Sequence, residues 1–383
     1  MLLRRDGAIA VRSYDTTMQV SVASDPRRLG RLLLNGLVFV ALPICVLIPF
    51  LTAAYHKGDL GLDFDRYMLP AARLVASGAS PYPGYGYPPL VAFALVPFTW
   101  LPGPNIVYCV LLIACVPLSL RLLGVTDWRC YGIVFLWTPV LTGVQSGNVT
   151  IPLLLGAAIC WHARTRWKTT AIAGGLTVAA KLLSWPLVVW LAATRRFRAA
   201  IGAVVVAAVV SVVLWSVLGF SSMVDYPARL SAAGRSSSPE SYTVKVLLQD
   251  LGVGAAPARL AMAFVAAAVL AGVVWFGWRG DDRRSFALAG LAMIVASPIV
   301  WMHSFVLLLI PVAVMRPRLS AAWLLPVAFL IGAGTGNGAP WQTAGVLALS
   351  VLTVALALLP PRRRSALPVP GQVQPSTTAP GSW

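Results

Sequence analysis

Three acidic side chains, Asp59, Asp63 and Asp65, lie within seven positions of a chain that has only 12 Asp and Glu among its 383 residues. A carboxylate held near a bilayer surface can act as a general base, taking a proton from a sugar hydroxyl as that oxygen attacks. The cluster therefore predicts the catalytic loop of a membrane-embedded transferase, with Asp63 as the base. The alternative interpretation is a solvated acid that caps the helix following it.

Arg66 and Tyr67 follow Asp63 at spacings of three and four residues. Side chains three and four positions apart share one face of an α-helix. The spacing therefore predicts that these three side chains face the same way, and that Arg66 and Tyr67 contact the substrate or its phosphate.

Two further ionisable residues, Lys181 and His303, stand in apolar segments. A charge at the centre of a bilayer costs about 2.5–3.5 kcal/mol even on the lenient insertion scale, so such residues indicate function. Both are candidates for binding an anionic headgroup or phosphate. Lys181 can alternatively extend its amine to the interface, and His303 can be a core residue bonded to a carbonyl.

Five more residues are candidate substrate contacts because aromatic rings stack on sugars and amides bond to hydroxyls. The alternative interpretations are an interfacial aromatic belt for the tyrosines and backbone satisfaction in a turn for the amides. The five residues are Tyr82, Tyr87, Gln145, Asn148 and Tyr242.

The elements that position these residues are predicted to be membrane helices. The chain is 58% hydrophobic and 11% charged, with a mean hydropathy of +0.79. Its net charge of +18 comes mostly from short Lys and Arg clusters between apolar runs, which is typical of cytoplasmic loops in a multispanning protein. The basic charge is therefore a topology signal, and we expect a membrane and no nucleic acid as partner.

The charge pattern predicts an all-α polytopic membrane protein with about 12 crossings and both termini in the cytoplasm. The expected organisation is a cytoplasmic segment over residues 1–28, a transmembrane catalytic domain over 29–360 and a disordered cytoplasmic tail over 361–383. Two external loops, 55–88 and 220–256, belong to the domain. Pro88–Leu101 is too short to cross comfortably, and Thr170–Thr194 is predicted to be a hairpin of two short helices with Lys181 near its outer apex.

No phosphate-binding loop, dinucleotide fingerprint, zinc-protease motif or nucleophile elbow occurs in the sequence. The five cysteines show no metal-ligand or disulfide spacing. We therefore expect no metal and no cofactor, although metal dependence stays open because Asp59, Asp63 and Asp65 could offer ligands.

Several short motifs, in one order along residues 30–320, resemble the family-87 glycosyltransferases, membrane enzymes of the GT-C type common in actinobacteria. The first external loop is similar in Asp63-Phe64-x-x-Tyr67, Gly78-x-x-Pro81-Tyr82 and Tyr87-Pro88-Pro89. Later matches are Gln145-Ser146-Gly147-Asn148, Lys181 to Pro186 with Thr194-Arg195-Arg196, Ser241 to Val244, and Ser297 to His303. After His303 the sequence departs from the pattern, because Ser304 stands where a larger residue is expected.

The resemblance implies a GT-C-type helical bundle in the plasma membrane and an inverting transferase in cell-envelope biosynthesis. It implies a polyprenyl-phosphate sugar, most often mannose, as donor, and a lipid- or glycan-linked acceptor on the outer face. An aspartate of the first external loop acts as base in this family, which corresponds to Asp63, with Asp59 and Asp65 as alternatives. Its donor phosphate would be stabilised by cationic groups such as Arg66, Lys181 or His303.

Two other functions remain open at this stage. One is an arabinofuranosyl or other pentosyl transferase with the same kind of donor. The other is a lipid or sugar transporter or flippase, which predicts internal repeats and polar residues at the bilayer midplane. The sequence shows no internal repeat, and its polar residues gather on one side of the predicted topology. The oligomeric state is not indicated.

Overall fold

The computed structural model describes residues 26–359 except 83, 238, 239, 333 and 335. Within these residues every regular element is a helix, which agrees with the predicted all-α class. Nearly all of the predicted segment 1–28, and the whole of the predicted tail 361–383, lie outside the described residues.

Among the described residues, five helices are long and apolar enough to cross a membrane. The first runs from Leu29 to His56 through α1 (Pro26–Gly36), the π-helical turn η1 (Leu37–Ala41) and α2 (Leu42–His56). The other four are α5 (Pro104–Leu123), α11 (Phe197–Leu218), α14 (Ala255–Trp278) and α18 (Pro340–Leu358). All five lie in long apolar runs of the sequence.

The remaining apolar segments are short or bent. Helices α7 (Thr138–Ser146) and α8 (Thr150–His162) would make a sixth span only as a pair bent by 115°. Other predicted crossings consist of short helices interrupted at Pro or Gly. Pro deprives a helix of a backbone donor, and Gly favours a left-handed turn. The total of about 12 crossings therefore stays a prediction.

The shorter helices fall into three groups along the chain. Before α8 they are the π-helical η2 (Phe64–Met68), α3 (Leu69–Ala76), α4 (Pro89–Ala94), η3 (Val96–Trp100), α6 (Trp128–Ile133) and η4 (Val134–Leu136). Between α8 and α14 they are α9 (Trp167–Ala180), η5 (Leu182–Ser184), α10 (Pro186–Ala193), α12 (Phe220–Ser237) and α13 (Val244–Asp250). After α14 they are α15 (Asp282–Val295), η7 (Met302–Leu308), α16 (Leu309–Met315), α17 (Ala321–Leu324) and η8 (Leu325–Ile331).

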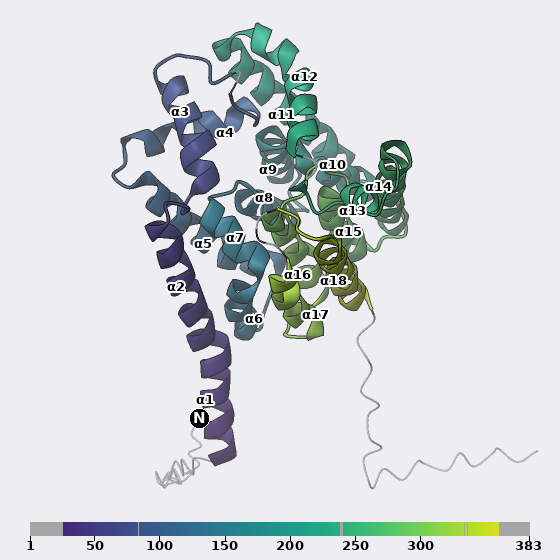
Figure 1. Cartoon of the computed structure of the whole chain (residues 1–383). Helices are drawn as coiled ribbons and strands as arrows, with labels where there is room; N and C mark the ends of the chain where they lie inside the picture. The colour runs from purple at the N-terminus through teal and green to yellow at the C-terminus, as the bar shows by residue number, and fades with distance from the viewer. Residues whose placement is uncertain (1–25, 83, 238–239, 333, 335, 360–383) are drawn as a thin grey trace, which may run out of the picture.

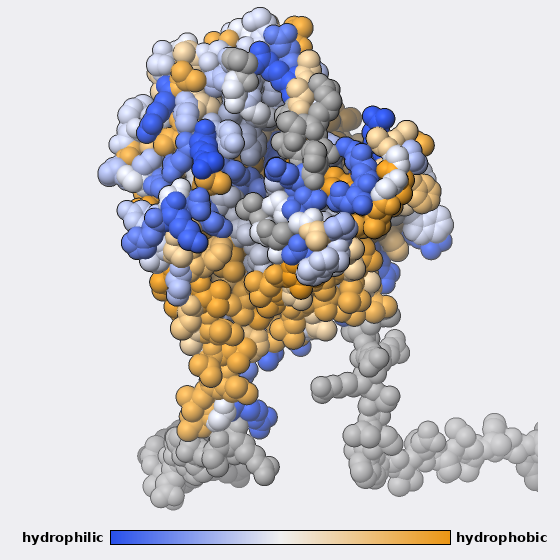
Figure 2. All heavy atoms as spheres, in the orientation of Figure 1, coloured by the Kyte–Doolittle hydropathy of each residue, from blue (hydrophilic) through white to orange (hydrophobic). Residues whose placement is uncertain are grey.

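Polar and apolar surfaces separate along the long axis of the molecule. Figure 2 shows a hydrophobic belt around the lower body and the α1–α2 column, beneath a mostly polar upper face. Elements α3, α4 and α12 lie at the upper end, whereas α1 begins and α18 ends toward the lower end (Figure 1). The predicted external loop 220–256 is largely helical, since α12 and α13 occupy it.

Small residues let α9 and α11 pack closely. A Cβ atom on Gly175 would stand 2.6 Å from the Cβ of Val206 and 2.7 Å from the carbonyl oxygen of Ala203. Membrane helices commonly use Gly and Ala at such contacts. The hydrophobic effect does not drive helix association within lipid, so close van der Waals packing provides the stabilisation instead. This contact fixes α9, whose end carries Lys181.

Candidate active site

The loop that carries Asp63 is held against the turn between α7 and α8. The backbone N–H of Gly61 donates to the carbonyl of Gln145 at 2.6 Å. Gly147 has φ +67°, and a Cβ there would lie 2.9 Å from the Cβ of Phe64. Both the left-handed backbone and the close approach require glycine at 147. This turn brings the Asp63 loop and Asn148 together although they are 85 positions apart.

Asn148 connects the carboxylate of Asp63 to Tyr87. Its Nδ2 donates to Asp63 Oδ2 at 2.6 Å and to the Tyr87 hydroxyl oxygen at 3.4 Å. Its Oδ1 accepts from the backbone N–H and the hydroxyl of Thr150, at 2.9 and 2.6 Å. Because Thr150 occupies the amide oxygen, the amide N–H₂ is directed at the carboxylate.

Lys181 supplies positive charge beside this group. Its Nζ lies 5.4 Å from the centre of the Tyr87 ring. Burial raises the pKa of Asp63 above its ordinary value, while the Asn148 hydrogen bond and the charge of Lys181 oppose that rise. A base with a raised pKa accepts a proton more readily, provided that the pH keeps it ionised.

His303 completes the cluster from the C-terminal half of the chain. It is 5% exposed, and neither of its ring nitrogens has a hydrogen-bond partner within the described residues. A Cβ atom on Gly143 would lie 3.6 Å from the Cβ of His303, so the histidine packs against α7, the helix that leads to Asn148. A buried polar atom without a partner costs about 1–3 kcal/mol. The two ring nitrogens are therefore suited to hydrogen-bond with a bound ligand.

Two of these side chains, Asn148 and Lys181, lie between helices, and the other two lie where a helical segment begins. Asp63 precedes η2, Asn148 separates α7 from α8, Lys181 separates α9 from η5, and His303 stands at the start of η7. Irregular backbone at membrane depth is tolerated where it lines a cavity or is buried in protein. The predicted helix break near Lys181 is present.

The other predicted site residues take supporting or separate positions. Tyr82 stacks on Trp215 and donates to the carbonyl of Tyr87 at 2.8 Å, so it holds Tyr87 in place. The backbone carbonyl of Gln145 accepts the hydrogen bond from the Gly61 N–H. Tyr242 is buried, and its N–H donates at 2.7 Å to the carbonyl of Val300, just before His303.

Arg66 and Tyr67 are exposed, and no described contact joins either to Asp63. The segment winds as a π-helix whose buried residues are Phe64 and Met68. Asp63 is half-buried whereas Arg66 and Tyr67 are exposed, and the common face of the three side chains stays a prediction.

The structure also separates the three acids. Asp65 is exposed, and burial raises its pKa while Asn105 and Arg73 lower it. Asp59 is half-buried in the turn after α2. Of the three, Asp63 alone bonds to Asn148 within the part of the chain that is described. In the same ranges, no group of three or more His, Cys, Asp or Glu side chains gathers for a metal.

Sequence reasoning missed Thr150, which orients Asn148. The signal was present, because an asparagine side-chain oxygen commonly accepts a hydrogen bond from the backbone N–H two residues later.

An apolar cavity of about 410 Å³ adjoins the His303 segment. Val300, Phe305 and Tyr242 form one wall, and aliphatic side chains of α14, α15 and α18 form the rest. Its wall of hydrocarbon can accept an aliphatic chain.

Comparisons with known proteins indicate the family of the chain. Residues 85–298, more than half of the chain, match Glycosyltransferase family 87. Three curated relatives are similar. A polyprenol-phosphate-mannose-dependent alpha-(1-2)-phosphatidylinositol pentamannoside mannosyltransferase of Mycobacterium tuberculosis is 29% identical over 66% of this chain and 61% of its own length. The protein of the same name from Mycolicibacterium smegmatis is 27% identical over 78% of each chain.

A third relative, a polyprenol-phosphate-mannose-dependent alpha-(1-2)-phosphatidylinositol mannoside mannosyltransferase of M. smegmatis, is 25% identical over 73% of this chain and 70% of its own. The match thus spans less than two thirds of the M. tuberculosis relative. No solved structure matches the chain. The extent of the family match decides the assignment: this chain belongs to glycosyltransferase family 87.

Proposed function

We propose that this protein is an inverting glycosyltransferase that moves mannose from a polyprenyl-phosphate donor to a lipid- or glycan-linked acceptor. The observation that carries the proposal is the Asn148 hydrogen bond to Asp63, with Lys181 beside Tyr87 and His303 packed against α7. The names of the curated relatives support the donor and the sugar.

In the proposed reaction an acceptor hydroxyl oxygen attacks the anomeric carbon while Asp63 takes the hydroxyl proton. The bond between that carbon and the phosphate oxygen breaks, and its electron pair leaves with the polyprenyl phosphate. Attack opposite the leaving group inverts the configuration at the carbon. Lys181 and His303 are the groups that would stabilise the negative charge of the departing phosphate.

Asn148 would hold Asp63 in the ionised form and in one orientation. Its amide is fixed by Thr150, so it cannot turn its oxygen toward the carboxylate without losing two hydrogen bonds. Such preorganisation means that the site need not rearrange as charge develops.

The lipid nature of the donor suits the surroundings of the site. A polyprenyl chain partitions into hydrocarbon at about 0.8 kcal/mol per CH₂ group. The apolar cavity beside Val300 and Phe305 offers such an environment next to the His303 segment.

We further propose that the site faces outward from the plasma membrane and that both chain ends face the cytoplasm. Support comes from the basic clusters of the sequence, which mark cytoplasmic loops. The start of α1 and the end of α18 both lie toward the end of the molecule opposite α3, α4 and α12 (Figure 1).

The test is a transfer assay with purified protein, polyprenyl-phosphomannose and a mannosylated lipid acceptor. Asp63→Asn is expected to lose transfer at least a hundredfold, whereas the matched change Asp65→Asn in the same loop should retain it. Near-full transfer by Asp63→Asn would remove the proposed base. Preference for polyprenyl-phosphoarabinose would replace mannose, and sugar movement across proteoliposomes without a new glycosidic bond would indicate a transporter.

A further inference from the structure

A second cluster of charged residues lies at the opposite end of three helices that carry the candidate site. Helix α8 begins beside Asn148 and reaches Arg164 after 13 residues, about 20 Å later. Helix α10 leads from the Lys181 break to Arg196, and α15 starts at Asp282 and ends before the His303 segment. The two clusters are therefore separated by the length of these helices.

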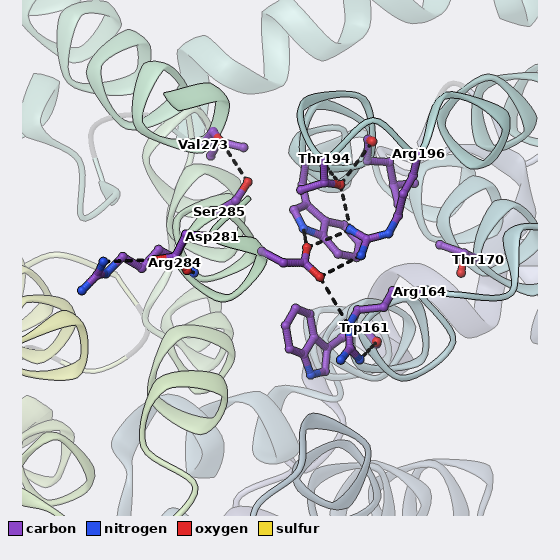
Figure 3. Close-up of polar contacts among 12 residues, drawn as sticks. Trp161, Arg164, Thr170, Thr194, Arg196, Val273, Asp281, Arg284 and Ser285 are labelled. Carbon is purple, nitrogen blue, oxygen red and sulfur yellow. Dashed lines mark hydrogen bonds and ion pairs between the residues drawn. The ribbon is translucent and has the colours of Figure 1, made fainter. Parts of the chain in front are cut away.

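The side chains of Arg164 and Arg196 lie near one another (Figure 3), and the carboxylate of Asp282 pairs with both. The Asp282 carboxylate accepts two hydrogen bonds of 2.8 Å from Arg196 and one of 2.9 Å from Trp190 Nε1. It also forms an ion pair with Arg164 at 3.3 Å. Asp281 is likewise bound by the backbone and guanidinium of Arg284, both at 3.0 Å. Both carboxylates are thus neutralised within the protein.

An open pocket of about 520 Å³ lies beside these ion pairs. Its lining residues are Trp161, Arg164, Arg279, Gly280, Asp281, Asp282 and Arg283. The volume falls within the range of about 300–1,000 Å³ that small-ligand sites occupy.

Two guanidinium groups of the pocket, those of Arg279 and Arg283, have no carboxylate partner among the described residues. Both side chains are exposed, and Arg279 lies 4.0 Å above the ring of Trp275. The ion-paired cluster and these two residues together hold five guanidinium groups and two carboxylates. Positive charge is therefore in excess in the pocket, which favours the binding of an anion. A guanidinium group can donate two parallel hydrogen bonds to the oxygens of one phosphate.

The position of the pocket relative to the bilayer indicates the source of the anion. It opens directly after α14, one of the five helices long enough to span a membrane. The last turn of α14 exposes Trp275 and Trp278, at 54% and 66%. Exposed tryptophans at a helix end are typical of the headgroup level of a bilayer.

We propose that this pocket binds the phosphate headgroup of an anionic membrane lipid through Arg279 and Arg283. Arg164, Arg196 and Arg284 keep the two carboxylates from repelling it. The bound lipid belongs to the leaflet opposite the candidate active site, so it is distinct from the donor and the acceptor.

The test is native mass spectrometry of the full-length protein released from phosphatidylcholine bilayers with and without phosphatidylglycerol. The wild-type protein is expected to retain phosphatidylglycerol. Arg279→Gln with Arg283→Gln should weaken this binding about tenfold to thirtyfold, since each basic residue at a membrane surface contributes about 1 kcal/mol. The control is Arg166→Gln with Arg198→Gln, which removes the same charge from exposed positions outside the pocket.

Three results would overturn the proposal. The first is equal loss of lipid in both double variants, which would indicate a diffuse field. The second is complete displacement of phosphatidylglycerol by free glycerol phosphate, which would indicate a soluble phosphate ester as ligand. The third is no preference of the wild-type protein for phosphatidylglycerol over phosphatidylcholine, a result that needs no variant to fold.

Discussion

Replacing Asn148 with Ala should move the acidic limb of the pH–rate profile to higher pH. Asp63 acts as a base only when ionised, so activity is lost as the pH falls through its pKa, which burial already raises. The 2.6 Å hydrogen bond from Asn148 favours the ionised form and lowers that pKa. Without it, the pKa of Asp63 rises further and the profile shifts upward.

The expected shift follows from the strength of the lost bond. A hydrogen bond to a charged group contributes about 1.5–3 kcal/mol, and 1.36 kcal/mol corresponds to one pKa unit. The acidic limb should therefore move by about one to two pH units. The assay is kcat/KM for mannosyl transfer as a function of pH, measured with purified protein and lipid-linked donor.

Asn105 provides the matched control, because its side chain lowers the pKa of Asp65 as Asn148 lowers that of Asp63. Asn105→Ala should leave the acidic limb in place. If Asn105→Ala moves the limb and Asn148→Ala does not, Asp65 is the base and the reasoning about Asp63 is refuted.

Three further predictions concern the frame of the site. Gly147→Ala should lower the thermal unfolding midpoint more than Gly124→Ala, because both have positive φ but only Gly147 meets another residue, Phe64, at 2.9 Å; the added clash costs about 1–3 kcal/mol, and equal midpoints would exclude it. Lys181→Met should reduce kcat at least tenfold while protein stability changes little, and unchanged kcat would remove its role in phosphate stabilisation. Asp282→Asn should destabilise the fold by about 1–3 kcal/mol because Arg164 and Arg196 lose their shared partner; denaturant unfolding in detergent measures this, and a change below about 0.5 kcal/mol would contradict it.

Much of the architecture was predictable because hydrophobicity acts locally. The spans at Leu29–His56, Pro104–Leu123 and Ala255–Trp278 agree with the apolar runs within a few residues. The break at Lys181 was predictable as well, since basic clusters on both sides of Thr170–Thr194 conflicted with a single crossing.

The candidate site was predictable only in part. Asp63, Asn148, Lys181 and His303 were found individually, because polar residues in apolar segments are conspicuous. The supporting position of Tyr82 was not found, because its stacking on Trp215 joins segments far apart in the chain.

By itself the sequence determined the class of protein, the long spans and a short set of polar residues, because side-chain hydropathy and charge govern how each segment partitions between lipid and water. The tertiary structure alone decided which acid bonds to Asn148 and that Arg66 and Tyr67 lie outside the cluster. The physical reason is that hydrogen bonds between Asp63 and Asn148, or between Gly61 and Gln145, join distant segments. Their geometry depends on how the broken helices pack, which no local pattern encodes.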